Sequence, residues 1–442
     1  MNDPACATSP VLTDRQAQLE ASRCLMCDDP PCVAACPAEV PVKHFIRALR
    51  FDTPRRAINL IRQRNVLAGI CGLACPVEKL CVGACSSTEL STPIAIGRLQ
   101  HYAAVTELAR EHDTPPPPAV GRRVAIIGAG PSGLAAAAEL ARRGHRPTVF
   151  EKHARAGGIC TYGVPNNRLP QTLVAGEIEY IKSLGVELRT GHTFGEDSTL
   201  DELLAKGFAA VYIAVGLQAP AVPSVPGLEL VGVMTWKQLL DAASAFHLSE
   251  GARPAITKDV LIVGGGSVAM DVASVARSLG AEEIDIVCLE APREMPADRD
   301  ELDEVWHAGA RFHTRSMPLE ITGRDGHVTG LKATRIRWKE PDRFVPANAE
   351  RIAGTEYWLP GTTIVFAIGA RPADDLARVL PGVNVHATGR IIVTPETGAT
   401  SRSGVFAGGD AVAGGGTTIV RSVAEGRRAA EAIDAYLQGD QP

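Results

Sequence analysis

The chain has 442 residues, room for about three domains, and 45% of them are hydrophobic, which is enough to build real cores. With 45 Lys and Arg against 50 Asp and Glu, the net charge of −5 offers no basic excess for phosphates, so nucleic acid is not an expected partner. The sequence has no uninterrupted apolar stretch of membrane-spanning length, and its N-terminus has neither a basic nor an apolar signal region. We therefore expect no membrane span and a cytoplasmic location, where thiols stay reduced.

The cysteines are concentrated near the N-terminus. Eight of the 11 form two runs, Cys24-x2-Cys27-x4-Cys32-x3-Cys36-Pro37 and Cys71-x3-Cys75-Pro76-x4-Cys81-x3-Cys85. Structural zinc usually takes cysteines as separated C-x2-C pairs, whereas runs ending in Cys-Pro are typical of [4Fe–4S] ligation, in which the last cysteine can bind the other cluster. We predict two [4Fe–4S] clusters; zinc or buried thiols without metal are the alternatives.

The segment around the cysteines is predicted to be helical. Thr13 and Gln16 have capping-box spacing, and apolar residues follow at helical intervals at Phe45, Ile46, Leu49, Ile58 and Ile61. We expect an α-helical domain over residues 1–114, followed by a semi-rigid polyproline spacer at Pro115–Pro118.

The next segment has the pattern of a dinucleotide-binding fold. A buried-strand pattern, 123–127, runs into the turn Gly128-Ala129-Gly130-Pro131-Ser132-Gly133 and an Ala-rich helix that stops near Gly144. The next strand, 146–150, ends at Glu151, where a carboxylate accepts hydrogen bonds from an adenosine ribose. The dinucleotide phosphates would lie at the helix N-terminus.

The same pattern recurs further along the chain. Strand 259–263 leads into Gly264-Gly265-Gly266-Ser267-Val268-Ala269, a helix ending near Gly280, strand 284–289 and then Glu290. A carboxylate at Glu290 would bind both ribose hydroxyls and repel a 2′-phosphate, which predicts NADH rather than NADPH. The opposing signals are Ala269, in place of a third glycine, and Arg293, which is close enough in sequence to meet a phosphate.

The order of motifs predicts that one nucleotide domain interrupts the other. Two strand-plus-glycine segments, 212–216 and 365–369, are placed where the chain would leave one domain and return, and a late strand, 404–407, precedes Gly408-Gly409-Asp410. The turn Gly414–Gly416 then opens a predicted helix, 417–437, whose N-terminal dipole would stabilise negative charge on a reduced flavin. We expect an FAD domain over 121–220 and 370–442 and an NAD domain over 221–369.

The predicted fold class is therefore α+β and multidomain. An N-terminal α-helical iron–sulfur domain is followed by two Rossmann-like, three-layer α/β nucleotide-binding domains, of which the FAD domain is discontinuous.

These motifs together resemble a known family. Cys24-Leu-Met-Cys-Asp-Asp-Pro-Pro-Cys32, the two Cys-Pro runs, Ile96-Gly-Arg-Leu-Gln100 and both glycine fingerprints resemble the flavin and iron–sulfur half of dihydropyrimidine dehydrogenase, over nearly the whole chain. More narrowly, the chain resembles the separate flavoprotein subunit (PreT type) of the bacterial NAD-dependent enzyme. The glutamate synthase small subunit is similar, but its pattern usually lacks a cysteine at Cys71 and has an acidic residue at Gln100.

The resemblance also implies site residues. It places Cys24, Cys27, Cys32 and Cys85 on one cluster and Cys36, Cys75, Cys81 and Gln100 on the other, with Cys71 left over. On chemistry alone a thiolate is the better iron ligand, so Cys71 stays open as the alternative to Gln100. Arg168 matches a flavin-contacting arginine. The candidate nucleotide-cofactor residues are Gly128, Ala129, Gly130, Pro131, Ser132, Gly133, Glu151, Gly158, Arg168, Gly409, Asp410, Thr417, Thr418, Gly264, Gly266, Ser267, Val268, Glu290, Ala367 and Gly369.

The cofactors FAD, NAD(H) and two [4Fe–4S] clusters predict an electron-input module, because FAD exchanges both hydride and single electrons. No remaining segment is long enough for an FMN-binding barrel of about 250 residues, so the resemblance implies an FMN- and iron–sulfur-containing partner subunit that reduces uracil or thymine. We assign no catalytic acid or base, since hydride transfer needs only stacked rings. The alternatives are a glutamate synthase small subunit or a related electron-transfer flavoprotein and, least favoured, a non-catalytic scaffold.

Overall fold

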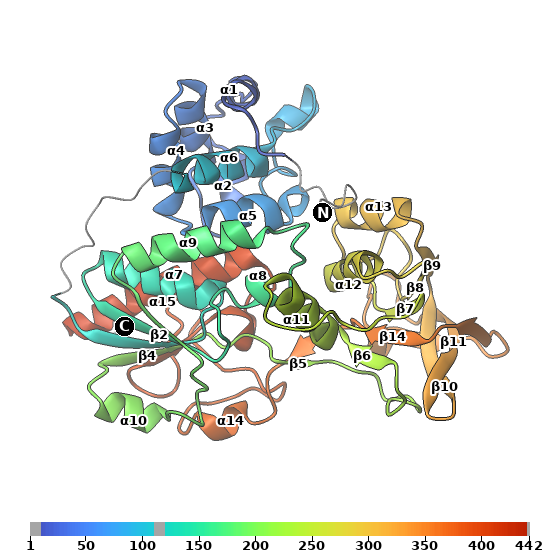
Figure 1. Cartoon of the computed structure of the whole chain (residues 1–442). Coiled ribbons are helices and arrows are strands. Elements are labelled where there is room, and N and C mark those ends of the chain that lie inside the picture. Colours follow the sequence, from blue (N-terminus) through green and yellow to red (C-terminus); the bar gives the residue numbers. More distant parts are fainter. Residues whose placement is uncertain (1–9, 110–119, 440–442) are drawn as a thin grey trace. The chain divides into compact units, whose positions relative to one another are not determined.

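The structure, a computed structural model, describes residues 10–109 and 120–439 (Figure 1). The predicted spacer at Pro115–Pro118 lies outside the described residues. Contacts between Cα atoms divide the chain into two compact units, one made of Met1–Thr161, Asn166–Gln218 and Pro372–Pro442, the other of Tyr162–Pro165 and Ala219–Arg371. Among the described residues, no helix is long and apolar enough to cross a membrane.

The N-terminal part of the first unit is helical. The predicted capping box is confirmed, because the Thr13 hydroxyl accepts the Gln16 N–H and the Gln16 side chain accepts the Thr13 N–H. The apolar residues predicted to face a core do so: Phe45, Ile46, Leu49, Ile58 and Ile61 are all buried in one cluster. The elements are α1 (Asp14–Ser22), α2 (Pro31–Ala34), α3 (Val42–Arg50), α4 (Pro54–Arg62), α5 (Ala68–Ala74), η1 (Val77–Lys79), η2 (Ser86–Glu89) and α6 (Ile96–Leu108).

The rest of the first unit is built on a five-stranded parallel sheet of order β16-β4-β1-β2-β3. Figure 1 shows α7 and α15 on one side of this sheet and α10 and α14 on the other. The elements are β1 (Arg123–Ile127), α7 (Pro131–Arg142), β2 (Arg146–Glu151), α8 (Ile159–Tyr162), α9 (Gln171–Ser183), β3 (Glu187–Thr190), α10 (Leu200–Ala205), β4 (Ala210–Ile213), α14 (Leu376–Val379), β16 (Val405–Ala407), η4 (Gly409–Ala411) and α15 (Ile419–Gln438).

The sheet order confirms that this fold is discontinuous. Strand β16 pairs in parallel with β4, with Val405 opposite Val211 and Ala407 opposite Ile213, although the whole second unit lies between them in sequence. Helix α15 begins at Ile419 rather than at the predicted 417, because the side chain of Thr418 caps it by accepting the Arg421 N–H.

The second unit has its own five-stranded parallel sheet, of order β6-β14-β7-β8-β9. Helices α11, α12 and α13 pack on one face of it, and an antiparallel sheet of β10 to β13 covers the other. The third layer is therefore a sheet rather than helices. The elements are β5 (Ala219–Pro220), β6 (Val233–Thr235), α11 (Trp236–His247), β7 (Asp259–Val263), α12 (Ser267–Ser278), β8 (Glu283–Val287), α13 (Arg299–His307), β9 (Arg311–His313), β10 (Ser316–Arg324), β11 (His327–Trp338), η3 (Pro346–Asn348), β12 (Ala349–Arg351), β13 (Tyr357–Pro360), β14 (Thr363–Phe366) and β15 (Ala370–Arg371).

In each parallel sheet one strand, β1 or β7, runs into the following helix, α7 or α12, through a glycine at which a side chain would clash. Gly128 has φ +101°, and a Cβ there would lie 2.5 Å from the Ala214 carbonyl oxygen. Gly264 has φ +143°, and its Cβ would lie 2.3 Å from the Ala367 oxygen. These close approaches place each glycine turn against the end of the neighbouring strand, at the carboxyl edge where open α/β sheets bind ligands.

Candidate functional site

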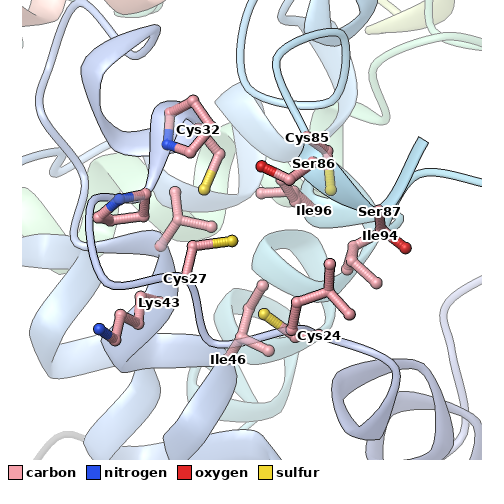
Figure 2. A pocket seen from close by; sticks show the side chains of 14 residues that line it. Cys24, Cys27, Cys32, Lys43, Ile46, Cys85, Ser86, Ser87, Ile94 and Ile96 are labelled. Atoms are coloured by element: carbon pink, nitrogen blue, oxygen red, sulfur yellow. The ribbon is translucent and has the colours of Figure 1, made fainter. Parts of the chain in front are cut away.

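Four cysteines converge on one pocket in the helical segment. Figure 2 shows the sulfur atoms of Cys24, Cys27, Cys32 and Cys85 pointing into the same space, whose other walls include apolar side chains of Ile46, Ile94 and Ile96. Burial, with the nearby Cys85 and Cys24, raises the pKa of Cys32 to about 11. Thiols in such a place need a cationic partner to ionise, which a multi-iron centre supplies. The donor set therefore fits an iron–sulfur cluster.

A side chain of α3 holds the backbone beside the pocket. The Arg50 guanidinium donates to the carbonyl oxygens of Ser22 (2.6 Å) and Cys24 (2.7 Å). Among the residues that the structure describes, no three His, Cys, Asp or Glu side chains are grouped closely enough to hold a single metal ion.

A second group of cysteines contains Cys36, Cys75 and Cys81, and Cys71 belongs to it. A hydrogen bond with the Cys71 side chain, together with burial and the nearby Cys36 and Cys81, raises the pKa of the Cys75 thiol. Burial and Cys36 raise the pKa of Cys81 to about 12. The side-chain amide N–H of Gln100, on α6, donates to the Ala68 carbonyl oxygen (2.8 Å) at the start of α5. Cys71 thus lies in the second group, and Gln100 contacts α5, the helix that carries Cys71.

A buried carboxylate joins the helical segment to the part of the first unit that is built on the five-stranded sheet. Since sequence predicts FAD binding by this part, we call it the flavin-type fold. Glu177 of α9, fully buried, accepts the N–H groups of Gly69 (2.7 Å) and Ile70 (3.1 Å) at the start of α5. Arg62 lies 4.0 Å from the Glu177 carboxylate, and its guanidinium stacks 3.3 Å over the Tyr180 ring. Burial raises the pKa of Glu177 to about 7, against the opposing effects of Arg62 and the two N–H groups.

The Glu177 contact brings the second cysteine group to the side of the flavin-type fold. Cys160 of α8 is fully buried, and after burial the nearby Cys71 contributes most to raising the pKa of its thiol. Arg168, which is half-buried, opposes this rise in pKa and so lies near Cys160. The sequence signal for Glu177 was a charged residue within the otherwise apolar stripe of Leu173, Val174, Ile178 and Ile181, and sequence reasoning missed it.

The first glycine turn gathers the residues predicted around it. The buried Glu151 carboxylate accepts the N–H groups of Ala129 (2.9 Å) and His153 (2.9 Å), so it faces the turn. A Cβ on Gly158 would lie 2.9 Å from the Gly130 Cα, whereas a Cβ on Gly130 would meet nothing within 4 Å. Open space beside Gly130, at the N-terminus of α7, is where a pyrophosphate would fit.

The late glycine loops are joined by a residue that sequence reasoning missed. The Glu425 carboxylate of α15 accepts the N–H groups of Gly409 (2.8 Å) and Gly416 (3.0 Å). Burial, and then the charge of Glu425, raises the pKa of Asp410 to about 6. Thr418 caps α15 and Thr417 precedes it, so Asp410 and both threonines lie around the start of this helix.

In the second unit the Glu290 carboxylate faces the glycine turn. A Cβ on Gly265 would lie 2.8 Å from the Glu290 Oε2. Burial raises the pKa of Glu290, and Arg315 opposes the shift. Arg315 donates its backbone N–H to the Glu290 carbonyl (3.4 Å) and pairs with Glu294 (2.5 Å). Arg315, 25 residues further along the chain, is thus the cation beside Glu290 that sequence reasoning missed.

The remaining predicted residues of this unit lie at the same turn. Ser267 and Val268 begin α12, and Gly266 caps it. Ala367 follows β14 and contacts Gly264, and Gly369, further along the same exit, has φ +109°. The predicted strand 284–289 is wrong at its end, since β8 stops at Val287 and leaves Glu290 in the following loop.

The helical segment carries two cysteine groups, and two parallel sheets follow it in the chain, each with a glycine turn and a facing carboxylate. These features define an iron–sulfur flavoprotein with two dinucleotide-binding domains. Two family models match the chain: dihydropyrimidine dehydrogenase domain II, 4Fe-4S cluster, over residues 5–112, and pyridine nucleotide-disulphide oxidoreductase over residues 122–428. The chain therefore belongs to the pyridine nucleotide-disulphide oxidoreductase family and carries a 4Fe–4S domain ahead of it.

Similar proteins are subunits of larger oxidoreductases. The chain is 34% identical to the NAD-dependent dihydropyrimidine dehydrogenase subunit PreT of Escherichia coli O157:H7, over 98% of this chain and 97% of that one. It is 31% identical to the glutamate synthase [NADPH] small chain of Escherichia coli, over 96% and 92%. It is 36% identical to the NADP(+)-dependent formate dehydrogenase subunit beta of Moorella thermoacetica, over 92% of this chain, and spans 60% of that subunit's length.

A solved structure has the same fold. Mycobacterium tuberculosis FprA in complex with NADPH aligns with a TM-score of 0.61 at 17% identity, over 73% of this chain and 87% of that one. At this identity the likeness supports the fold of the two nucleotide-type sheets and no more.

Proposed function

We propose that this chain is the electron-input subunit of an NAD-dependent dihydropyrimidine dehydrogenase, an oxidoreductase acting on a CH–CH group. It oxidises NADH through FAD and passes electrons through two [4Fe–4S] clusters. The acceptor is a partner subunit, carrying FMN and further clusters, that reduces uracil or thymine to the 5,6-dihydropyrimidine. The observation that carries the proposal is the clamp of Glu177 on the start of α5, because it holds the helix bearing Cys71 and leading to Cys75 against the flavin-type fold.

The proposed ligands are Cys24, Cys27, Cys32 and Cys85 for one cluster and Cys36, Cys75, Cys81 and Gln100 for the other. The Gln100 side-chain N–H donates to the Ala68 carbonyl oxygen, so the amide oxygen of Gln100 points away from Ala68. Among the described residues, no group donates to the amide oxygen of Gln100, which would leave it available to a cluster. Cys71 is the alternative, supported by its place beside Cys75, whose pKa it raises.

FAD is proposed to bind the first unit and NAD(H) the second. When bound, FAD supplies exchange between a two-electron hydride donor and one-electron clusters. The turn Gly128–Gly133 and α7 would hold the pyrophosphate, Glu151 the ribose, and Gly158, Arg168, Gly409, Asp410, Thr417 and Thr418 the flavin side. In the second unit Gly264, Gly266, Ser267 and Val268 would hold the phosphates and Glu290 the ribose, with Ala367 and Gly369 beside the turn.

Removing the Glu425 carboxylate is expected to weaken FAD binding. Glu425→Ala leaves two N–H groups without their acceptor and frees the loops at Gly409 and Gly416. Loss of two such hydrogen bonds costs about 2 kcal/mol, so the FAD dissociation constant should rise roughly 30-fold. Fluorescence titration of the deflavinated protein measures this. Glu431→Ala, which removes a half-exposed carboxylate from the same helix, should leave the constant unchanged.

The proposed function is tested by supplying and withholding the partner. The isolated holoprotein should oxidise NADH with an artificial acceptor and form no dihydrouracil. Adding the FMN-containing subunit from the neighbouring reading frame should switch on uracil reduction. Dihydrouracil formed by this chain alone would contradict the division of labour, and absence of NADH oxidation with the dye would favour a scaffold.

A glutamate synthase small subunit is the second candidate, supported by the 31% identity over nearly the whole of that relative. Its partner would be a very large amidotransferase subunit. If such a subunit, and not an FMN-barrel subunit, supports NADH oxidation without a dye and produces glutamate from glutamine and 2-oxoglutarate, the pyrimidine assignment is wrong.

A further inference from the structure

The α3–α4 hairpin is strongly basic in a chain that is acidic overall. Residues 43–64 contain seven Lys or Arg and a single carboxylate, Asp52, whereas the whole chain has a net charge of −5. Three of the seven have structural partners: Arg50 holds the carbonyls of Ser22 and Cys24, Arg62 pairs with Glu107 (2.7 Å), and Arg64 with Glu39 (3.5 Å). The other four basic residues are Lys43, Arg47, Arg55 and Arg56.

These four residues, which we call the basic face, make no polar contact within the described part of the chain that would hold the fold together. Arg47, Arg55 and Arg56 are exposed, and Lys43 is half-buried. Within residues 10–109 and 120–439, none of the four has an ion pair or a side-chain hydrogen bond. Both helices bury their opposite sides in one apolar cluster, so the basic face looks away from that core. Positive charges that the fold leaves unpaired at the surface attract a negatively charged surface.

The surroundings of the basic face resemble a protein–protein interface. Phe51, in the turn between α3 and α4, is 66% exposed and supplies an apolar centre beside the cations. Arg55 and Arg56 line an open hollow along α4 together with Asp52, Asn59, Leu60 and Gln63. An apolar anchor with charged residues around it is the usual anatomy of a transient interface, in which charge pairs set the association rate.

The face also adjoins the first cysteine group. Lys43 and Ile46 of α3 line the pocket of Cys24, Cys27, Cys32 and Cys85 (Figure 2), and Arg50 of the same helix holds the Cys24 carbonyl. A protein that docks on α3 and α4 would therefore come close to this group. The second cysteine group lies instead beside the flavin-type fold, where Glu177 clamps α5.

We propose that the basic face is the docking surface for an acidic patch on the electron-accepting partner. The inference rests on the proposed function and adds which face of the chain the acceptor meets and what charge the acceptor carries there. Electrostatic steering of this kind raises association rates by about 10 to 10³-fold at low salt and is lost as salt screens the charges.

The test uses the holoprotein and, as probe, a plant-type [2Fe–2S] ferredoxin, which is acidic. Prereduced ferredoxin gives up one electron to the oxidised holoprotein, and stopped-flow absorbance follows the second-order rate. We expect the rate to fall about tenfold between 20 and 200 mM NaCl. The triple variant Arg47→Glu/Arg55→Glu/Arg56→Glu should be slower than wild type by about tenfold or more at low salt.

The matched control is Arg324→Glu/Lys332→Glu/Arg351→Glu, which makes the same charge change at exposed positions of the second unit. Its rate should stay within about twofold of wild type. The docking inference is overturned if the hairpin variant keeps the wild-type rate, or if both triple variants lose rate equally. Flavin reduction by NADH is measured in the same preparations. If NADH fails to reduce the flavin of the wild-type protein, the proposed function is wrong, whatever the result for docking. If NADH reduces the flavin in every variant, the variants are folded and hold their cofactors.

Discussion

Glu290→Arg is expected to shift the nicotinamide preference from NADH toward NADPH. The Glu290 carboxylate lies against the glycine turn at Gly265, where it would bind the adenosine ribose hydroxyls and repel a 2′-phosphate. Replacing it with arginine exchanges this repulsion for a charge-assisted hydrogen bond. Each of the two changes is worth about 1.5–3 kcal/mol, so the ratio of rate constants for NADH and NADPH should change by about 10²-fold or more.

The neighbouring Arg315 sharpens this prediction. Its backbone N–H donates to the Glu290 carbonyl, and its charge opposes the rise in pKa of the Glu290 carboxyl. Glu290→Gln therefore removes the negative charge that would repel a 2′-phosphate, and it leaves the Arg315 cation beside the ribose site. We expect the neutral variant alone to improve reduction by NADPH about tenfold, and the double variant with Arg315→Ala to lose most of that gain.

Stopped-flow reduction of the flavin by each nucleotide measures these effects, with FAD content as the check on folding. Asp303→Arg, the same kind of charge reversal on an exposed residue of α13, should leave the preference unchanged. If NADPH at low concentration reduces the wild-type flavin as fast as NADH does, Glu290 does not select against the 2′-phosphate.

The parts of the molecule that sequence predicted well are those in which the chemistry is local. A glycine turn, the strand before it and the helix after it are neighbours in the chain, so β1 and β7 were placed at their observed bounds. The Thr13 capping box and the apolar spacing of α3 and α4 are equally local and equally confirmed. The first cysteine group needed more, because Cys85 lies far from Cys24, and only the family resemblance brought it in.

The parts that sequence missed depend on contacts between distant segments. Glu177 reaches α5 across more than 100 residues, and Glu425 joins two loops that each looked like flavin-facing turns on their own. Arg315 reaches Glu290 from the start of the antiparallel sheet. A buried charge shows in sequence only as a break in an apolar stripe, and its partner does not show at all, since hydrogen-bond geometry is set by packing.

Loss of one thiol is expected to remove half of the iron. Anaerobically purified protein should hold about eight irons, with matching acid-labile sulfide, if two [4Fe–4S] clusters are present. Cys75→Ser should reduce this to about four, because Cys75 lies with Cys36 and Cys81 in the second group. Cys288→Ser, a buried cysteine of the second unit, should keep the full content. Zinc without acid-labile sulfide would end the cluster interpretation.

The fourth ligand of the second cluster is decided by a pair of variants. Cys71→Ser should keep about eight irons, because Cys71 is not a ligand in the proposed set and a serine can stay beside Cys75. Gln100→Ala removes the amide that is hydrogen-bonded to the start of α5, so this variant should lose or alter the second cluster. Gln100→Leu, which keeps the volume of the side chain, separates loss of the ligand from loss of packing. Iron and sulfide content with electron paramagnetic resonance of the reduced protein gives the readout. Loss of the second cluster in Cys71→Ser, with a normal spectrum in Gln100→Leu, would instead make the thiolate of Cys71 the ligand and Gln100 only the residue that holds the start of α5.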